Sequence, residues 1–296
     1  MKKSTLLKIL LTGLLLIVLF FKVSISDIIQ ITLSMNPVYF AGAILLVPIL
    51  LILRTWRWKF FLCSVGICLP FCESLKVLLI GNFYGLITPG HIGEIGRAYH
   101  MNEKKVITLP TIILEKIIDI CTLIGLSLVT ILFYFPENSI MIVIIIACGI
   151  AIPAGIILLT NKKIVYFISK LFGIHKEESD QFSDNFRSLI SNYSLVGFSF
   201  FISLIYYCVA YLLGYLVILS AGFNPVVFIT LPIIVLMGNI PLTIAGIGLR
   251  ESVGTLTFVY LGENAANGFV FAFLLFILIT VLPGFVGYVL AIRGRE

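Results

Sequence analysis

Residues 81–97 read GNFYGLITPGHIGEIGR, and residues 238–251 read GNIPLTIAGIGLRE. Both stretches begin with Gly-Asn, are broken by Gly and Pro, and end with a Glu close to an Arg. They lie in a chain that is 60% hydrophobic and 11% charged, whereas soluble domains carry about 25% charged residues. With a mean hydropathy of +1.15, the chain needs lipid as its main solvent. The charges in these two stretches therefore require a partner or a function.

Six segments have the length and apolar character of membrane-spanning helices, which need about 17–25 residues: 6–23, 37–53, 117–135, 140–160, 195–221 and 269–292. The segment at 6–23 is at the long edge for the apolar core of a signal peptide, so we expect a retained helix. With both termini in the cytoplasm, all of the 20 basic residues except Lys22 and Arg250 fall on the cytoplasmic side. This distribution predicts a multi-pass protein of the cell (plasma) membrane.

The two opening stretches lie in segments that we interpret as re-entrant hairpins, at 60–101 and 226–262. Each hairpin begins and ends on one side of the membrane and contains apolar runs that are too short for a span. Irregular backbone at membrane depth is tolerated where protein or a wet cavity satisfies its polar groups. The halves at about 37–135 and 195–292 have opposite orientation, which predicts an inverted-topology repeat with a binding site near the midplane.

The two hairpins also match weakly in sequence. Gly81-Asn82 corresponds to Gly238-Asn239, Thr88 to Thr243, and Gly90 and Gly93 to Gly246 and Gly248. The predicted fold class is an all-α polytopic membrane protein with six full transmembrane helices plus two re-entrant helical hairpins. Residues 1–296 then form a single integral membrane domain.

Two further features of the sequence fit this topology. Residues 161–193 are polar and are expected to form a cytoplasmic connection with an amphipathic helix. Trp56 and Trp58 follow the second helix and fit an interfacial aromatic belt.

The charges of the hairpins indicate an anion site. A charge at the centre of a membrane helix costs about 2.5–3.5 kcal/mol, and Arg250 and Glu251 point about 100° apart on a helix. We therefore expect cross-pairing of Glu94 with Arg250 and of Arg97 with Glu251. Open glycine amides and two arginines favour a phosphate or carboxylate. Alternatively, these residues only hold the hairpins together.

The candidate substrate-binding and translocation residues are the polar, charged, Gly and Pro positions of the hairpins and two acidic residues near the helix at 117: Asn82, Thr88, Pro89, Gly90, Gly93, Glu94, Arg97, Glu115, Asp119, Asn239, Thr243, Gly246, Gly248, Arg250 and Glu251. Glu115 and Asp119 could instead only complement the dipole of a cytoplasmic helix end. The scattered His and Cys residues form no ligand pattern, so neither a metal nor a cofactor is expected. The net charge of +6 is attributed to cytoplasmic loops, not to nucleic acid binding.

The Gly, Pro, polar and charged positions form a series between residues 82 and 251: Asn82, Thr88-Pro89-Gly90, Gly93-Glu94, Arg97, Glu115, Asp119, Gly246-x-Gly248 and Arg250-Glu251. This series resembles the lysylphosphatidylglycerol synthase transmembrane family, although Ala245 stands where a Pro would be expected. The family includes the flippase half of the bacterial enzyme that makes and exports aminoacylated phosphatidylglycerol, and the membrane part of some archaeal glycosyltransferases. The resemblance implies lipid translocation or lipid-linked work.

The leading functional hypothesis is a lipid flippase or scramblase, in which Arg97 and Arg250 hold an anionic or lipid-linked headgroup. Glu94 and Glu251 would release the headgroup by competing for these arginines, or would carry a proton. The alternatives are an ion-coupled transporter of a small soluble anion and a subunit that presents a lipid to a separate partner enzyme. No polar segment is long enough for a soluble transferase domain, and no nucleophile or metal set indicates an intramembrane enzyme.

Overall fold

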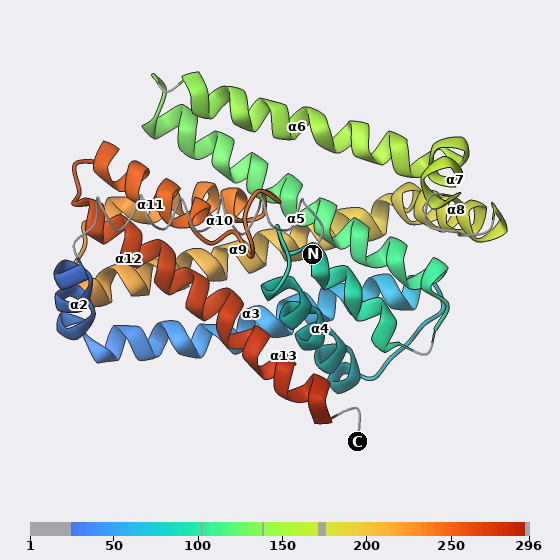
Figure 1. The fold of residues 1–296 in the computed structure, drawn as a ribbon, viewed down its shortest axis with the longest axis horizontal. Coiled ribbons are helices and arrows are strands. Elements are labelled where there is room, and N and C mark those ends of the chain that lie inside the picture. The colour runs from blue at the N-terminus through green and yellow to red at the C-terminus, as the bar shows by residue number, and fades with distance from the viewer. Residues whose placement is uncertain (1–24, 102, 138, 171–175, 294–296) are drawn as a thin grey trace. The chain divides into compact units, whose positions relative to one another are not determined.

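The computed structural model describes residues 25–101, 103–137, 139–170 and 176–293, so the predicted helix at 6–23 lies outside it. The described part is all-helical and contains no β-strand, as the sequence predicted (Figure 1). It divides into two compact units. Unit 1 contains the described residues up to Leu51, with Leu78–Glu94 and Tyr207 onward, and unit 2 contains Ile52–Val77 and Ile95–Tyr206.

Among the residues that the structure describes, four helical stretches are long and apolar enough to cross a membrane, with mean hydropathies between 2.2 and 2.8: α3 (Pro37–Ser64), α5 (Lys105–Tyr134), α9 (Tyr193–Ala221) and the continuous stretch Ala265–Arg293. They contain the predicted spans at 37–53, 117–135, 195–221 and 269–292. The predicted span at 140–160 forms α6 (Ser139–Thr160). The chain is therefore a multi-pass membrane protein.

Two predicted helix boundaries are wrong. Helix α3 continues past residue 53 to Ser64, and α5 begins at Lys105 instead of residue 117. Trp58, which we expected at a membrane interface, consequently lies inside α3 with no exposed surface. The additional helical turns of α3 and α5 carry charged residues that the apolar pattern had placed outside the helices.

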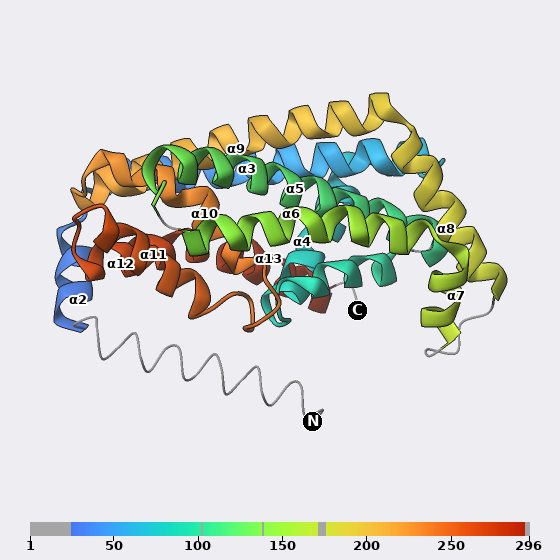
Figure 2. The same cartoon turned by 90° about the horizontal axis from the view of Figure 1, so that it is seen from above.

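Unit 1 contains α2 (Ile25–Ser34), η2 (Pro225–Thr230), α10 (Leu231–Gly238) and α11 (Leu249–Tyr260), followed by α12 (Ala265–Phe276), the π-helical turn η3 (Ile277–Val281) and α13 (Leu282–Arg293). Helices α11 and α12 lie side by side (Figures 1 and 2). They approach closely because Gly254 faces Gly268: a Cβ at position 254 would lie 2.7 Å from the Gly268 carbonyl oxygen. Small residues commonly allow such close helix contacts in membranes.

Helix α11 ends and helix α12 begins with recognised capping motifs. Gly262 adopts φ +84°, its N–H donates to the Val259 carbonyl, and the Glu263 N–H donates to the Phe258 carbonyl at 2.9 Å. This is the Schellman pattern that ends helices at glycine. Asn264 then begins α12, because its side chain accepts a hydrogen bond from the Ala266 N–H.

Unit 2 contains α5, α6, α7 (Lys162–Lys170) and α8 (Lys176–Ser191), with parts of η1 (Ile92–His100), α3, α4 (Phe71–Leu86) and α9. Helix α7 follows α6 directly and packs with α8 (Figure 2). Helix α8 packs on α5 through a buried cluster. The members of this cluster are Phe61, Leu114, Ile118, Phe186 and Leu189. In the predicted polar connection at 161–193, the described residues thus form the helices α7 and α8, and α8 is held by an apolar contact.

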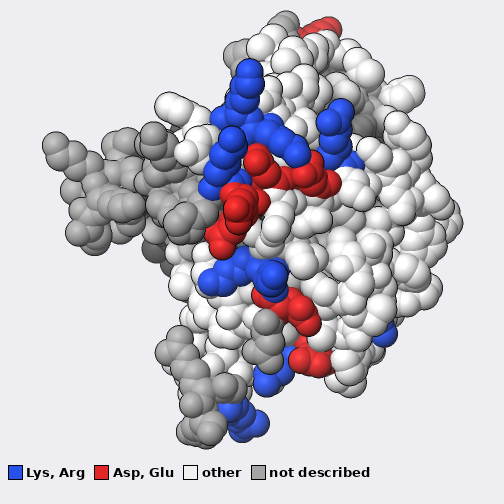
Figure 3. Space-filling model, turned by 90° about the vertical axis from the view of Figure 1, so that its right-hand side faces the viewer, with Lys and Arg blue, Asp and Glu red and all other residues white. Residues whose placement is uncertain are grey.

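Exposed charges gather in unit 2. They include Lys104 and Lys105 at the start of α5 and Arg187 on α8. Lys162 and Asp184 form an exposed ion pair at 2.7 Å. Figure 3 shows Lys and Arg lying among Asp and Glu on one face, beside broad uncharged areas.

Candidate functional site

Helices α3, α5 and α9 bring together a buried group of charged side chains in unit 2. Arg57 is 1% exposed. Its Nη1 lies 2.5 Å from Asp119 Oδ1, and its Nη2 lies 2.8 Å from Asp119 Oδ2. Arg57 also donates to Glu115 Oε1 at 3.0 Å and to the Ser203 hydroxyl. The two carboxylates lie four residues apart on α5 and therefore share one face of that helix.

Arg97 completes this group from η1. It donates through Nη2 to the second oxygen of Glu115, so Glu115 bridges two guanidinium groups. The Arg97 Cζ lies 4.1 Å from the centre of the Trp58 ring. Trp58 is itself held by a 3.3 Å hydrogen bond from Nε1 to the Thr111 hydroxyl. We call Arg57, Arg97, Glu115, Asp119 and Ser203 the arginine cluster.

The arginine cluster retains unused donors. The Nε atoms of Arg57 and Arg97 are buried and have no hydrogen-bond partner in the described part of the chain. Glu115 is the hydrogen-bond partner of Arg97 among the described residues. Since a guanidinium carries five N–H donors, Arg97 can bind a further acceptor. Phosphate and carboxylate oxygens suit this planar fork.

In unit 1, the loops at 87–91 and 239–248 meet at their tips. Pro89 and Ile244 pair as an isolated antiparallel bridge, and the Ala245 N–H donates to the Thr88 carbonyl at 3.2 Å. A Cβ at Gly90 would lie 2.8 Å from the Asn239 carbonyl oxygen. The close approach of these backbones explains the glycine in the Thr-Pro-Gly sequence. We call residues 88–91 and 243–246 the loop junction.

The two loops have matching backbone conformations. Gly90 and His91 have φ of 56°, while Ala245 and Gly246 have φ of 51° and 75°. Each pair of positive φ values directly follows the residue that forms the bridge. Gly90 therefore corresponds to Ala245, not to Gly246 as predicted. The Pro expected at 245 cannot fit, because its ring fixes φ near −65°.

Arg250 is buried beside the loop junction at 5% exposure. Its Nη2 lies 3.4 Å from His91 Nε2 and donates to the Ala245 carbonyl at 3.5 Å. Its Cζ lies 4.9 Å from the Phe276 ring centre. These contacts are long, and its Nε has no partner among the described residues. Gly238 makes room for Arg250, because a Cβ there would lie 2.6 Å from the Arg250 Nε.

Glu251 has a local structural role. Its Oε2 accepts the Gly248 N–H at 2.6 Å, which caps the first turn of α11. The predicted partner of Arg97 was Glu251, but Arg97 pairs with Glu115. The sequence missed this pairing because it placed Glu115 at a helix end, whereas α5 begins ten residues earlier, at Lys105. The alternative role of Glu115 as a dipole-complementing helix end is therefore wrong.

Some of the backbone amides that we expected to bind an anion already donate hydrogen bonds within the protein. The Gly93 N–H donates to the Thr88 hydroxyl at 2.7 Å, and the Gly248 N–H donates to Glu251. These two amides therefore do not form an open cradle. The arginine side chains are better placed to bind an anion.

The remaining predicted residues of the two hairpins also lie in unit 1. Asn82 and Thr243 are buried. The Asn239 side chain donates to the Val235 carbonyl at 2.9 Å. Glu94 Oε1 lies 4.0 Å from His91 Nδ1. The unit thus brings most candidates of both hairpins to one place.

Sequence reasoning missed Arg57, Trp58 and Ser203. Arg54 and Arg57 are three residues apart in RTWRWK, so a longer α3 would have placed both on one helix face. The predicted helix end at residue 53 hid this relationship. Ser203 lies in an apolar helix and gave no comparable indication.

The family model of the lysylphosphatidylglycerol synthase transmembrane region matches residues 5–287. The chain belongs to this family. A UPF0104 membrane protein of Methanocaldococcus jannaschii is 28% identical over 123 residues. That match covers 40% of this chain and 36% of the archaeal protein. For this family member, the arginine cluster and the loop junction are the two candidate sites.

Proposed function

We propose that the protein translocates lipids with an anionic or lipid-linked headgroup between leaflets. The observation that carries this proposal is Arg97, a buried guanidinium with unused donors whose hydrogen-bond partner among the described residues is Glu115. A charge at membrane depth is expensive even when it is paired, and such residues commonly mark substrate pathways. The family assignment supports lipid as the substrate class.

The proposed chemistry is an exchange of partners. Before a lipid binds, Glu115 pairs with both Arg97 and Arg57, and Asp119 supplies the second negative charge at Arg57. A headgroup phosphate can replace one Glu115 oxygen at Arg97, because both are oxyanions with similar geometry. Glu115 remains bound to Arg57 during this exchange, so its charge is not left alone. Glu115 then recovers Arg97 when the lipid leaves.

The loop junction supplies a second part of the proposal. Arg250 makes long contacts beside the loop junction, where the Pro89–Ile244 bridge and the hydrogen bond from the Ala245 N–H to the Thr88 carbonyl are among the contacts that join the two loops. Separation of the loops would admit a headgroup to Arg250 while the acyl chains stay in the bilayer.

The proposed orientation has both termini in the cytoplasm. Exposed basic residues such as Lys104, Lys163 and Arg187 lie in unit 2, and cytoplasmic loops carry an excess of Lys and Arg. The cell membrane remains the proposed location.

The test is reconstitution into liposomes that contain fluorescent phosphatidylglycerol, with translocation followed by dithionite quenching. We expect Arg97→Gln to slow translocation about 10- to 100-fold, since hydrogen bonds to charged groups contribute about 1.5–3 kcal/mol. Arg97→Lys should retain part of the rate, and Arg187→Gln is the exposed control. Unchanged translocation of anionic lipids by Arg97→Gln contradicts the proposal. Uptake of phosphate into sealed vesicles, without lipid translocation, would instead favour a soluble-anion transporter.

A further inference from the structure

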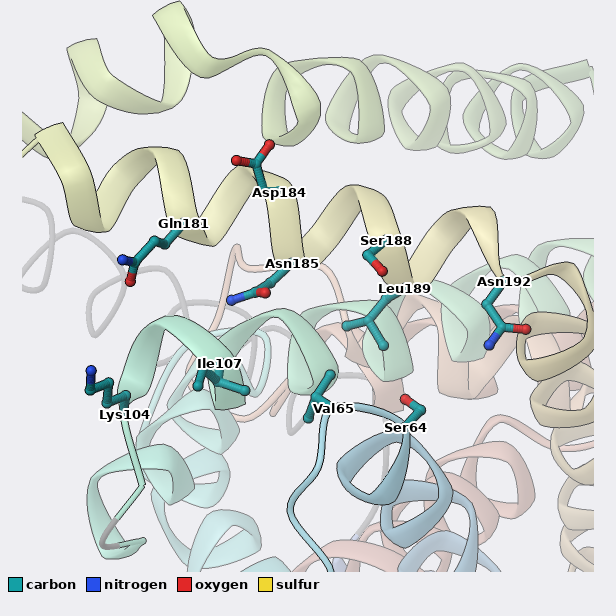
Figure 4. Close-up of a pocket in the computed structure, with 10 residues that line it drawn as sticks. All are labelled: Ser64, Val65, Lys104, Ile107, Gln181, Asp184, Asn185, Ser188, Leu189 and Asn192. Carbon is teal, nitrogen blue, oxygen red and sulfur yellow. The ribbon is translucent and has the colours of Figure 1, made fainter.

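A cavity of about 540 Å3 lies in unit 2 between α8, the first turn of α5 and the end of α3. Figure 4 shows polar side chains of α8 above the cavity and Lys104, Ile107 and Val65 on its opposite side. The volume falls within the range of small-molecule sites, about 300–1,000 Å3. None of its lining residues belongs to the arginine cluster or the loop junction.

Helix α8 and the residue that follows it present a stripe of neutral polar groups to this cavity: Gln181, Asn185, Ser188 and Asn192. Their spacing places them on one side of a helix. Asp184 also borders the cavity, but Figure 4 shows its carboxylate turned away from it, and it pairs with Lys162. The stripe therefore offers amide and hydroxyl groups without a free carboxylate.

Several of these groups have free hydrogen-bonding capacity. Asn185 Nδ2 donates to the Val106 carbonyl at 3.0 Å, which leaves its Oδ1 as an acceptor. Asn192 Oδ1 accepts from the Leu195 N–H, which leaves its Nδ2 as a donor. Amides can donate and accept at once, as can the vicinal hydroxyl groups of a sugar or polyol.

The other side of the cavity adds an apolar surface and one positive charge. Val65 and Ile107 line this side, and Leu189 of α8 extends toward them (Figure 4), so these apolar side chains can contact the C–H face of a ring. Lys104 lies at the first turn of the 30-residue helix α5, whose N-terminal dipole adds to the favourable potential for an anion.

We propose that this cavity binds a polyhydroxylated ring that carries a phosphate. The amide stripe binds the hydroxyl groups, the apolar side contacts the ring, and Lys104 binds the phosphate. The source is either a soluble sugar phosphate or the headgroup of a lipid such as phosphatidylinositol. This site is independent of the proposed translocation, so Arg97→Gln should leave it intact.

The first test is calorimetric titration of the purified full-length protein with glucose 1-phosphate, glucose and inorganic phosphate. We expect glucose 1-phosphate to bind more tightly than either fragment. Gln181→Ala and Lys104→Gln should each weaken its binding about tenfold, the effect of losing one hydrogen bond of about 1.4 kcal/mol. The exposed controls Glu178→Ala and Lys163→Gln should leave it unchanged.

The second test separates the two sources and does not depend on those variants. Ser188→Cys, in a background without the native cysteines, is labelled with maleimide in nanodiscs. Protection by added glucose 1-phosphate indicates a soluble ligand, whereas protection by phosphatidylinositol but not phosphatidylcholine indicates a lipid headgroup. Ser191→Cys on the same helix is the control. Failure of both compounds to protect Ser188→Cys overturns the proposal, as does equal binding of glucose 1-phosphate to the Gln181→Ala and Lys104→Gln variants.

Discussion

Pro89 and Ile244 face each other as an isolated antiparallel bridge, although 154 residues of the chain lie between them. Directly opposed residues in antiparallel pairs have Cα atoms about 4.5–5.5 Å apart, which suits a disulfide. In a background without native cysteines, Pro89→Cys with Ile244→Cys should therefore crosslink under mild oxidation. Gel mobility after cleavage between the two positions would detect the link.

This crosslink also tests whether the loops must separate. If headgroups pass between them, the oxidised double variant should lose lipid translocation in liposomes, and a reductant should restore it. Either single variant is the control. Full translocation by the crosslinked protein would show that the loop junction stays closed during the cycle.

Ala245 stores backbone strain at the loop junction. A non-glycine residue in the left-handed region costs about 1–2 kcal/mol, and Ala245 has φ +51°. We expect Ala245→Gly to raise the thermal unfolding temperature in detergent, and Ala245→Pro to lower it sharply. Ala266→Gly, within helix α12, is the matched control and should lower it, since Gly costs about 0.5–1 kcal/mol in a helix. A lower unfolding temperature for Ala245→Gly would contradict the strain argument.

Replacing glycines by alanine should distinguish glycines in a close helix contact from glycines with no neighbouring atom. Gly254→Ala places a Cβ against the α12 backbone, 2.7 Å from the Gly268 carbonyl oxygen, so helices α11 and α12 must move apart. Overpacking of this kind typically costs about 1–3 kcal/mol. Gly197→Ala in α9 meets no heavy atom within 4 Å and should be neutral or slightly stabilising. Thermal unfolding of both variants gives the comparison, and equal effects would argue against close packing of α11 on α12.

The sequence predicts the helices well because twenty consecutive apolar residues have few alternatives in a bilayer. The prediction fails at the C-terminal end of α3 and the N-terminal end of α5, because the charged residues Arg57, Glu115 and Asp119 indicated helix boundaries there. Arg57 and Asp119 are 62 residues apart, and a single sequence cannot show that two such charges neutralise each other. The register of the loop junction was missed for a related reason: Gly90 matches Gly246 by residue type, but Ala245 by backbone conformation.

The Arg57–Asp119 pair should behave as a buried ion pair. Removing one partner leaves an uncompensated buried charge and typically costs about 3–5 kcal/mol. We expect Arg57→Leu and Asp119→Leu each to destabilise strongly, and the double variant to destabilise by less than the sum. The exposed pair Lys162 and Asp184 is the control, because such pairs contribute about 0–1 kcal/mol. Denaturant unfolding in micelles measures both cycles, and additive effects at Arg57 and Asp119 would contradict the pairing.

In the proposed exchange of partners, Glu115 holds Arg97 when no lipid is bound, so removing the charge of Glu115 should change binding and transport in opposite directions. Glu115→Gln keeps the size of the side chain but weakens its hold on Arg97. We expect this variant to retain anionic lipid more tightly in native mass spectrometry and to translocate it more slowly, because release requires the carboxylate to recover Arg97.

The control for Glu115→Gln is Glu178→Gln, at an exposed position of α8. This variant should change neither the retention nor the translocation of anionic lipid. Arg97→Gln should lose both retention and transport, and the double variant with Glu115→Gln should resemble Arg97→Gln alone. These results together would assign Glu115 to release and Arg97 to binding. If Glu115→Gln instead loses lipid retention, the carboxylate acts mainly by positioning Arg97, and the exchange of partners is wrong.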